Sequence, residues 1–109
     1  LLADLAEATQ LSIEIREADI PLAPAARRTA DLLGLDPLGV ANEGKLVAVV
    51  PADHVPQALA AMRNHPLGDR AAVIGQLDPR RPALVELLTR NGGRRIVQRP
   101  YGEELPRIC

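Results

Sequence analysis

Residues 45–50, Lys-Leu-Val-Ala-Val-Val, limit the fold of this chain more than any other segment. Five of the six side chains are apolar and three are β-branched, which favours a strand over a helix. Because no polar position alternates with the apolar ones, such a strand needs cover on both of its faces. The sequence therefore predicts that residues 45–50 form a central strand, closed by Pro51, in a sheet with packed helices.

Helical periodicity and chain-breaking residues predict three helices. The first is already under way at the start of the chain, the second spans residues 24–33, and the third spans residues 53–64. Pro24 suits a first helical turn because its missing amide hydrogen would be unpaired there, while Gly34 can end the second helix and Asp53 can cap the third. The side chains expected on the buried faces are Leu1, Leu2, Leu5 and Ala6, then Ala26, Ala30 and Leu33, then Val55, Leu59 and Met62.

Four further segments are predicted to be strands. Residues 11–16 alternate apolar with polar side chains, the pattern of a half-buried strand, and residues 71–77, 84–89 and 94–97 are rich in apolar residues. The Asn-Gly-Gly sequence at 91–93 predicts a hairpin turn. Helices and strands in mixed order predict an α+β domain with a mixed β-sheet and helices packed on one side.

Composition and charge exclude several classes of function. The formal net charge is −1 with both signs interspersed, and the sole aromatic residue is Tyr101, so we expect neither nucleic acid nor an anionic membrane as a partner. No apolar run is long enough to span a bilayer as a helix. One cysteine cannot form an internal disulfide and no leader peptide is visible, which favours a cytoplasmic protein. The helix under way at Leu1 indicates a fragment of a longer chain.

The sequence lacks the motifs that are typical of a phosphate-binding loop, a metal site and a serine nucleophile. The only Gly-Gly pair belongs to the hairpin turn, so there is no phosphate-binding loop. His54, His65 and Cys109 are scattered without the spacing of metal ligands, and we expect the histidines to be structural. Ser12 lies within a strand pattern and is expected at the surface.

Cys109 stands out because it is the last residue, at the end of a tail with two prolines. Pro100 and Pro106 resist regular structure, so we expect residues 99–109 to be extended and loosely held. Ten residues from Pro100 can span roughly 30 Å, which allows the sulfur to visit other sites. The adjacent carboxylate disfavours the thiolate, whereas Arg107 or a cationic receiving site favours it. The alternative is an incidental cysteine, or one exposed by truncation.

Asn42, Glu43 and Gly44 form the other candidate site. Asn and Gly suit a tight turn, and a carboxylate held where a strand begins can accept a proton. Without other information, a turn with a solvated acid explains the same pattern.

Three stretches follow one another in a distinctive order: Ala-Asn-Glu-Gly-Lys-Leu-Val-Ala-Val-Val at 41–50, His-Pro-Leu-Gly at 65–68 followed by Ala-Ala-Val-Ile-Gly at 71–75, and the terminal Leu-Pro-Arg-Ile-Cys at 105–109. Together they resemble the HypE family, which belongs to the AIR-synthetase (PurM-like) superfamily. The resemblance implies that residues 1–98 form a PurM-like C-terminal domain and that residues 99–109 are a flexible tail carrying a reactive cysteine.

The same resemblance implies an activity and a set of partners. The family is an ATP-dependent carbamoyl dehydratase that makes the cyanide ligands of nickel-iron hydrogenase. Cys109 would receive a carbamoyl group from HypF, the group would be dehydrated to a thiocyanate with Glu43 as base, and cyanide would pass to the HypC–HypD complex. Pro106, Arg107 and Ile108 would dock the tail, and Asn42 and Gly44 would support the Glu43 motif.

The resemblance also implies where the remaining parts of the enzyme lie. ATP and Mg²⁺ would be bound mainly by an N-terminal domain outside this chain, so we expect no cofactor here, no activity from the fragment alone, and a homodimer for the full-length protein. Other AIR-synthetase-like enzymes, namely selenophosphate synthetase, thiamine-monophosphate kinase and a purine-pathway synthetase, share the domain but not the cysteine tail. A noncatalytic interaction domain, whose tail only docks into a partner, is the alternative from another class.

Overall fold

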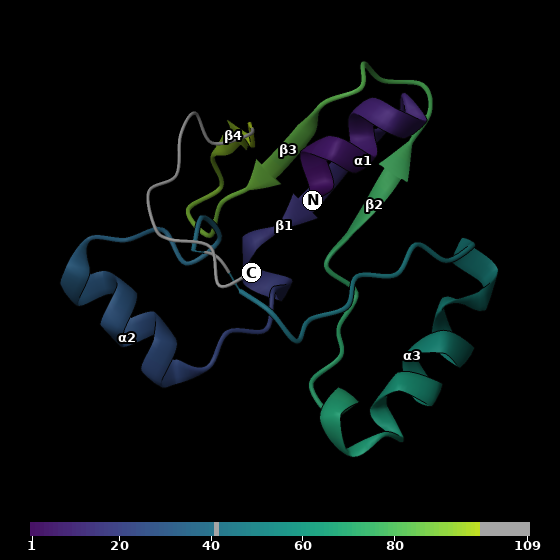
Figure 1. Cartoon of the computed structure of the whole chain (residues 1–109). Coiled ribbons are helices and arrows are strands. Elements are labelled where there is room, and N and C mark those ends of the chain that lie inside the picture. The colour runs from purple at the N-terminus through teal and green to yellow at the C-terminus, as the bar shows by residue number, and fades with distance from the viewer. Residues whose placement is uncertain (41, 99–109) are drawn as a thin grey trace. The chain divides into compact units, whose positions relative to one another are not determined.

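The computed structural model describes residues 1–40 and 42–98, which divide into two compact units (Figure 1). The first unit combines residues 1–20 with residues 72–98, and the second contains the described residues of 21–71. Two segments that are far apart in the sequence thus meet in the first unit. The predicted site residues Pro106, Arg107, Ile108 and Cys109 lie outside the described residues.

The first unit contains a mixed four-stranded sheet. Its strands are β1 (Ser12–Arg16), β2 (Gly75–Asp78), β3 (Val85–Leu88) and β4 (Arg94–Ile96), in the order β2-β1-β3-β4. β1 pairs with β3 in parallel and with β2 antiparallel, and β3 pairs with β4 antiparallel. Together with the helices of the chain, this mixed sheet confirms the predicted α+β class.

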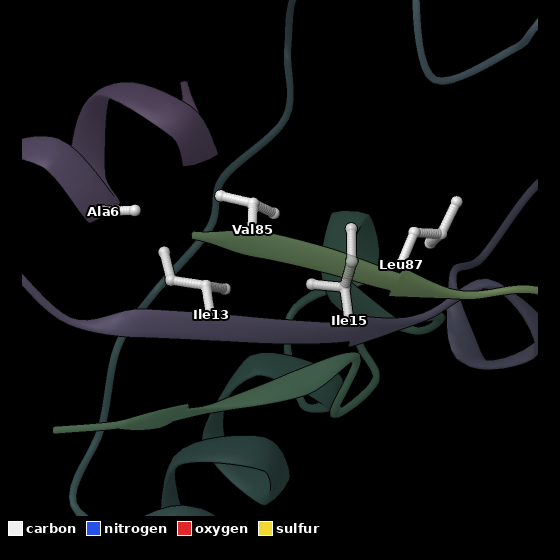
Figure 2. Close-up of a cluster of buried hydrophobic side chains, with 5 residues drawn as sticks. All are labelled: Ala6, Ile13, Ile15, Val85 and Leu87. Atoms are coloured by element: carbon white, nitrogen blue, oxygen red, sulfur yellow. The ribbon is translucent and has the colours of Figure 1, made fainter. Parts of the chain in front are cut away.

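One face of this sheet carries the hydrophobic core (Figure 2). Ile13 and Ile15 of β1 lie beside Val85 and Leu87 of β3, and Ala6 of α1 (Leu2–Thr9) contacts the same cluster. Half-buried side chains complete it, namely Leu2, Ala3, Leu5, Ile20, Leu77 and Val97. The predicted alternation is therefore confirmed for residues 13–16, where Ile13 and Ile15 enter the core and Glu14 and Arg16 do not. Leu1, expected on the buried face of the first helix, is instead 81% exposed.

Ser12 corrects a second expectation, because it is buried rather than at the surface, with 3% of its area exposed. It begins the central strand β1, where the neighbouring strands cover it on both sides: Asp78 of β2 is its partner, and the amide of Ile13 donates to the carbonyl of Leu84, just before β3. Position within the sheet, not side-chain polarity, determines its burial.

The β3–β4 hairpin matches the prediction for residues 91–93. The amide of Thr89 donates to the carbonyl of Gly93 (2.8 Å), and the amide of Gly93 donates to the Thr89 hydroxyl (2.9 Å). Gly92 has φ +83°, a left-handed conformation that costs glycine little. The turn chemistry read from the sequence therefore determines this connection.

The second unit contains α2 (Pro24–Leu33) and α3 (Val55–Arg63), together with 3₁₀ segments at Ala52–His54 and Pro66–Gly68. A third 3₁₀ segment, Glu17–Asp19, belongs to the first unit. α2 has the predicted bounds and ends at Gly34, whose φ is +66°. Of its expected buried residues only Ala30 is buried, while Ala26 is exposed and Leu33 is 65% exposed. The sequence thus predicted the bounds of α2 correctly, but it predicted more buried side chains on this helix than the structure shows.

The third helix differs from expectation at its start. α3 begins at Val55 after the 3₁₀ turn, and no side chain caps its amides, so Asp53 is not the predicted cap. Val55, Leu59 and Met62 are nevertheless half-buried on one face, as their spacing predicts. Proline at the second helical position needs no donor, which lets the helix start beside it.

Residues 45–50 are not a strand, which overturns the expectation that most limited the fold. Leu46, Val47 and Val49 are 76%, 43% and 57% exposed. A strand exists only when a neighbour satisfies its backbone donors and acceptors. All four strands among the described residues belong to the first unit, whereas residues 45–50 belong to the second. An apolar, β-branched sequence therefore does not suffice to make residues 45–50 a strand.

Gly75 provides a stability test of the β1–β2 pair. A Cβ atom at Gly75 would clash with the carbonyl oxygen of Glu14, so one of the two strands has to shift. We expect Gly75→Ala to lower the free energy of unfolding by about 2 kcal/mol, as for other overpacked sites. Equilibrium urea denaturation of the full-length protein measures this, with Gln76→Ala as the neighbouring control. Unchanged stability of the Gly75→Ala variant would contradict the close approach of β1 and β2 at this position.

Candidate active site

The Asn42-Glu43-Gly44 motif lies in the connection between α2 and α3. All three residues are exposed, and the backbone bends at Gly44, whose φ is +71°. Glycine adopts this left-handed conformation without the cost that other residues bear. The motif thus presents a carboxylate on a surface bend instead of at the mouth of a strand. An exposed carboxylate of this kind can accept a proton from a group brought to it.

The other predicted site residues cannot be compared with this motif. Pro106, Arg107, Ile108 and Cys109 lie outside the described residues, as does the predicted extended conformation of residues 99–109. The structure therefore does not bring Glu43 and Cys109 together or place them apart. Both assignments stay predictions.

The polar face of the sheet carries an ionic cluster that sequence reasoning missed. Glu14 of β1 and Glu86 of β3 are paired in the parallel register, and their side chains are 17% and 24% exposed. One Arg94 nitrogen, Nη1, lies 3.3 Å from Glu14 Oε2 and 3.1 Å from Glu86 Oε2. Arg81 Nη1 approaches the same two oxygens at 3.7 and 3.2 Å. The two arginines offset the repulsion between adjacent carboxylates, so the cluster is structural.

The only signal for this cluster in the sequence was the outward position of Glu14 in the alternation of β1. Its partner Arg94 is 80 residues away, and no local pattern connects the two. The same holds for Glu17, whose Oε2 accepts a hydrogen bond from the Arg90 amide at 2.9 Å across 73 residues. Both contacts depend on the parallel β1–β3 pairing, which only the tertiary structure establishes.

A second ion pair lies at the end of β2. Arg80 Nε and Nη2 donate to the two carboxylate oxygens of Asp78 at 3.0 and 3.1 Å, and the Arg80 amide donates to the same side chain. The hydrogen bonds from Arg80 hold the pKa of Asp78 below its ordinary value, and the carboxylate raises the pKa of Arg80. This pair, in which Arg80 is exposed and Asp78 is half-buried, closes a turn and contains no reactive group.

His65 has a structural contact in the second unit. His65 Nδ1 accepts a hydrogen bond from the Leu67 amide at 3.1 Å and so caps the 3₁₀ segment Pro66–Gly68. His54 is the residue that precedes α3. Within residues 1–40 and 42–98, no three His, Cys, Asp or Glu side chains are grouped so as to hold a metal. In the same part of the chain, no helix has the length and apolar character needed to cross a membrane.

Comparison with known proteins then identifies the domain. Residues 1–85 match the model of the C-terminal domain of AIR synthase related proteins. This chain belongs to that family. The match covers most of the described residues and both units, and it agrees with the α+β architecture of helices and a mixed sheet.

Within the AIR synthase related family, the chain is similar to HypE proteins over almost its whole length. It is 47% identical to the carbamoyl dehydratase HypE of Bradyrhizobium diazoefficiens over 108 residues, which cover 99% of this chain and 31% of that protein. It is 45% identical to the Escherichia coli K12 protein of the same name over 106 residues, which cover 97% of this chain and 31% of that protein. The chain spans about a third of the length of these relatives.

Solved HypE structures share the fold. The E. coli HypE crystal structure superposes with a TM-score of 0.88 at 44% identity, covering 99% of this chain and 33% of that chain. A HypE structure in complex with ATP has a TM-score of 0.86 at 36% identity, covering 99% of this chain and 33% of that chain. A HypE–HypF complex has a TM-score of 0.83 at 34% identity, covering 91% of this chain and 32% of that chain.

Proposed function

We propose that this chain is the C-terminal part of an ATP-dependent carbamoyl dehydratase that supplies cyanide ligands for nickel-iron hydrogenase. The observation that carries the proposal is the similarity, over 97–99% of the chain, to proteins named carbamoyl dehydratase HypE. Residues 1–98 are the PurM-like domain and residues 99–109 the tail that carries Cys109. The fragment alone is inactive, because about two thirds of the relatives' length lies outside it.

In this proposal the chain supplies a nucleophile and a base. The Cys109 thiolate forms a bond to the carbamoyl carbon while the bond from that carbon to its carrier on HypF breaks, which gives a thiocarboxamide. ATP then phosphorylates the amide oxygen, and loss of phosphate together with the two N–H protons leaves a thiocyanate on the same sulfur, with Glu43 accepting one of these protons. Pro106, Arg107 and Ile108 dock the tail, and Asn42 and Gly44 hold Glu43 on its bend. Support for Glu43 comes from its exposure on the bend at Gly44.

ATP, metal and partners are assigned to the full-length protein. By the resemblance to HypE, we assign ATP and Mg²⁺ mainly to an N-terminal domain outside this chain. The solved HypE complexes with ATP and with HypF support ATP as co-substrate and HypF as carbamoyl donor. The HypC–HypD complex is the cyanide acceptor, the full-length protein is a homodimer, and the reaction takes place in the cytoplasm.

Glu43→Gln in the full-length protein tests the assigned base. The amide nearly preserves the shape of the side chain but cannot accept a proton, so carbamoylation of Cys109 should survive while dehydration slows by about 100-fold or more. Intact-mass measurement after addition of HypF, its carbamoyl substrate and ATP separates free, carboxamide and nitrile forms.

Asp53→Asn serves as the control, because it removes another exposed carboxylate of the same unit and leaves Glu43 and its turn in place. If the Glu43→Gln protein accumulated nitrile at the parent rate, Glu43 would be a turn residue and the base would come from elsewhere. The proposed role of Cys109 would then be unaffected.

A further inference from the structure

Backbone hydrogen bonds hold the last described part of the chain to the sheet. The amide of Val97 donates to the carbonyl of Val85 at 2.8 Å, and Val97 packs half-buried against the core. The described chain ends one residue later, so residues 99–109 are attached to the sheet at this point. A contact that fixes β4 therefore also fixes the start of the segment that carries Cys109.

Arg94 ties β4 to a strand with which β4 does not pair. It is the first residue of β4, and β3 lies between β4 and β1 in the sheet. Its Nη1 atom nevertheless reaches Glu14 of β1 as well as Glu86 of β3, at 3.3 and 3.1 Å. Arg81 precedes β3, so it neutralises the same carboxylates without holding β4. Within this ionic cluster, Arg94 is thus the side chain that links β4 to the centre of the sheet.

A second contact fixes the turn of the β3–β4 hairpin. Glu17 directly follows β1, and its Oε2 atom accepts a hydrogen bond from the Arg90 amide at 2.9 Å. Arg90 lies in the connection between β3 and β4. The hairpin is therefore held to β1 and its end at two points, by Arg94 and by Glu17. Loss of one contact leaves the other in place, so a test has to remove both.

We propose that Arg94, Glu14 and Glu17 are positioning residues, which fix the point on the sheet where the tail carrying Cys109 begins. This inference rests on the proposed function, in which the Cys109 sulfur is the reacting atom. A tethered group has a higher effective concentration at a site within its reach when the tether is short. The contacts of the hairpin keep the tether short, because they prevent β4 from becoming part of it.

The length of the tether determines the size of the expected effect. Cys109 lies twelve residues beyond Val97 and twenty-one residues beyond Leu88, the last residue of β3. If β4 left the sheet, the tether would start near Leu88, and its average span would grow by about a third. Effective concentration falls roughly as the −3/2 power of tether length, which gives about a twofold loss.

Distances between two spin labels in the full-length protein test the anchor without using the reaction. One nitroxide is attached to Cys109 and the other to Ala8→Cys, at an exposed position of α1 in the same unit, with cysteines outside this chain changed to serine. The double variant Arg94→Glu with Glu17→Ala adds a carboxylate beside Glu14 and removes the acceptor of the hairpin amide. We expect the distribution of label distances to widen by about a third. An unchanged distribution would overturn the proposal.

Two controls separate the anchor from general stability. Arg94→Lys keeps the charge and Gly75→Ala disturbs the pairing of β1 with β2 on the other side of the sheet, so both should keep the parent distribution. Equal widening in Gly75→Ala would overturn the proposal. Protection of the β1 amides from hydrogen exchange shows that the double variant keeps its sheet. Arg94→Gln with Glu17→Ala, which adds no repulsion, replaces it if that protection is lost.

The reaction supplies a further readout on the same variants. Starting from the carboxamide form, nitrile formation should slow about twofold in the double variant and keep the parent rate in Arg94→Lys. Parent-rate nitrile formation in a double variant with widened distances would overturn the positioning role. If the parent protein showed no modification of Cys109 at all, the proposed function would fail while the distance result stood, so the two failures are distinguishable.

Discussion

Cys109→Ser in the full-length protein is expected to abolish both the carboxamide and the nitrile mass changes. The proposed first step needs a sulfur nucleophile, and a serine hydroxyl is far less nucleophilic near neutral pH. Cys109 is also the only cysteine of this chain, so no neighbouring thiol of the domain can replace it. Intact-mass measurement with HypF, its carbamoyl substrate and ATP should find only the unmodified Ser variant.

The control for this experiment separates chemistry from docking. Cys109→Ser retains Arg107 and Ile108, so binding of HypF to the variant should match that of the parent protein. A noncatalytic interaction domain predicts the same unchanged binding but no modification of the parent at Cys109. Carboxamide formation on the Ser variant would contradict the assignment of Cys109 as the acceptor.

Leu87→Ala is expected to lower the free energy of unfolding of the domain by about 3 kcal/mol, because it leaves a cavity at the centre of the core. Leu87 is 1% exposed and is the largest fully buried side chain among the described residues. It lies on β3 beside the core residues of β1 (Figure 2). Hydrogen exchange of the β1 and β3 amides in the full-length protein, measured by mass spectrometry, reports this loss of stability in the domain itself.

Two control substitutions test whether the effect of Leu87→Ala comes from a cavity in the core. Leu87→Met preserves most of the volume and should cost less than about 1.5 kcal/mol. Leu84→Ala removes a side chain that is 42% exposed, and we expect a cost below about 1 kcal/mol. If Leu84→Ala and Leu87→Ala accelerated exchange equally, the core would not be centred on β3.

Local patterns predicted the elements whose stabilising contacts are close in the sequence. The 24–33 helix has its proline at the start and its left-handed glycine at the end, and the 91–93 turn forms its bonds within five residues. The alternation of residues 11–16 also predicted which side chains of β1 enter the core. In each case, side-chain period or backbone preference determines the outcome without a distant partner.

The candidate site was predictable only in part. The bend at Gly44 follows from local residue preferences, and Glu43 is exposed on it. The meeting of Glu43 with Cys109 would depend on a tail outside the described residues and on parts of the protein beyond this chain. The Glu14–Glu86–Arg81–Arg94 cluster was not foreseen, because it arises from the order of strands in the sheet.

By itself, the sequence determined the mixed α+β character, α2, the core-facing side chains of β1 and the resemblance to HypE. Tertiary structure alone decided the parallel pairing of β1 with β3, the burial of Ser12 and the exposure of residues 45–49. The physical reason is that helices and turns satisfy their backbone groups locally, whereas a strand depends on a neighbour that can be far away in the chain. Residues 45–50 have the composition of a central strand, but no strand pairs with them within the described residues.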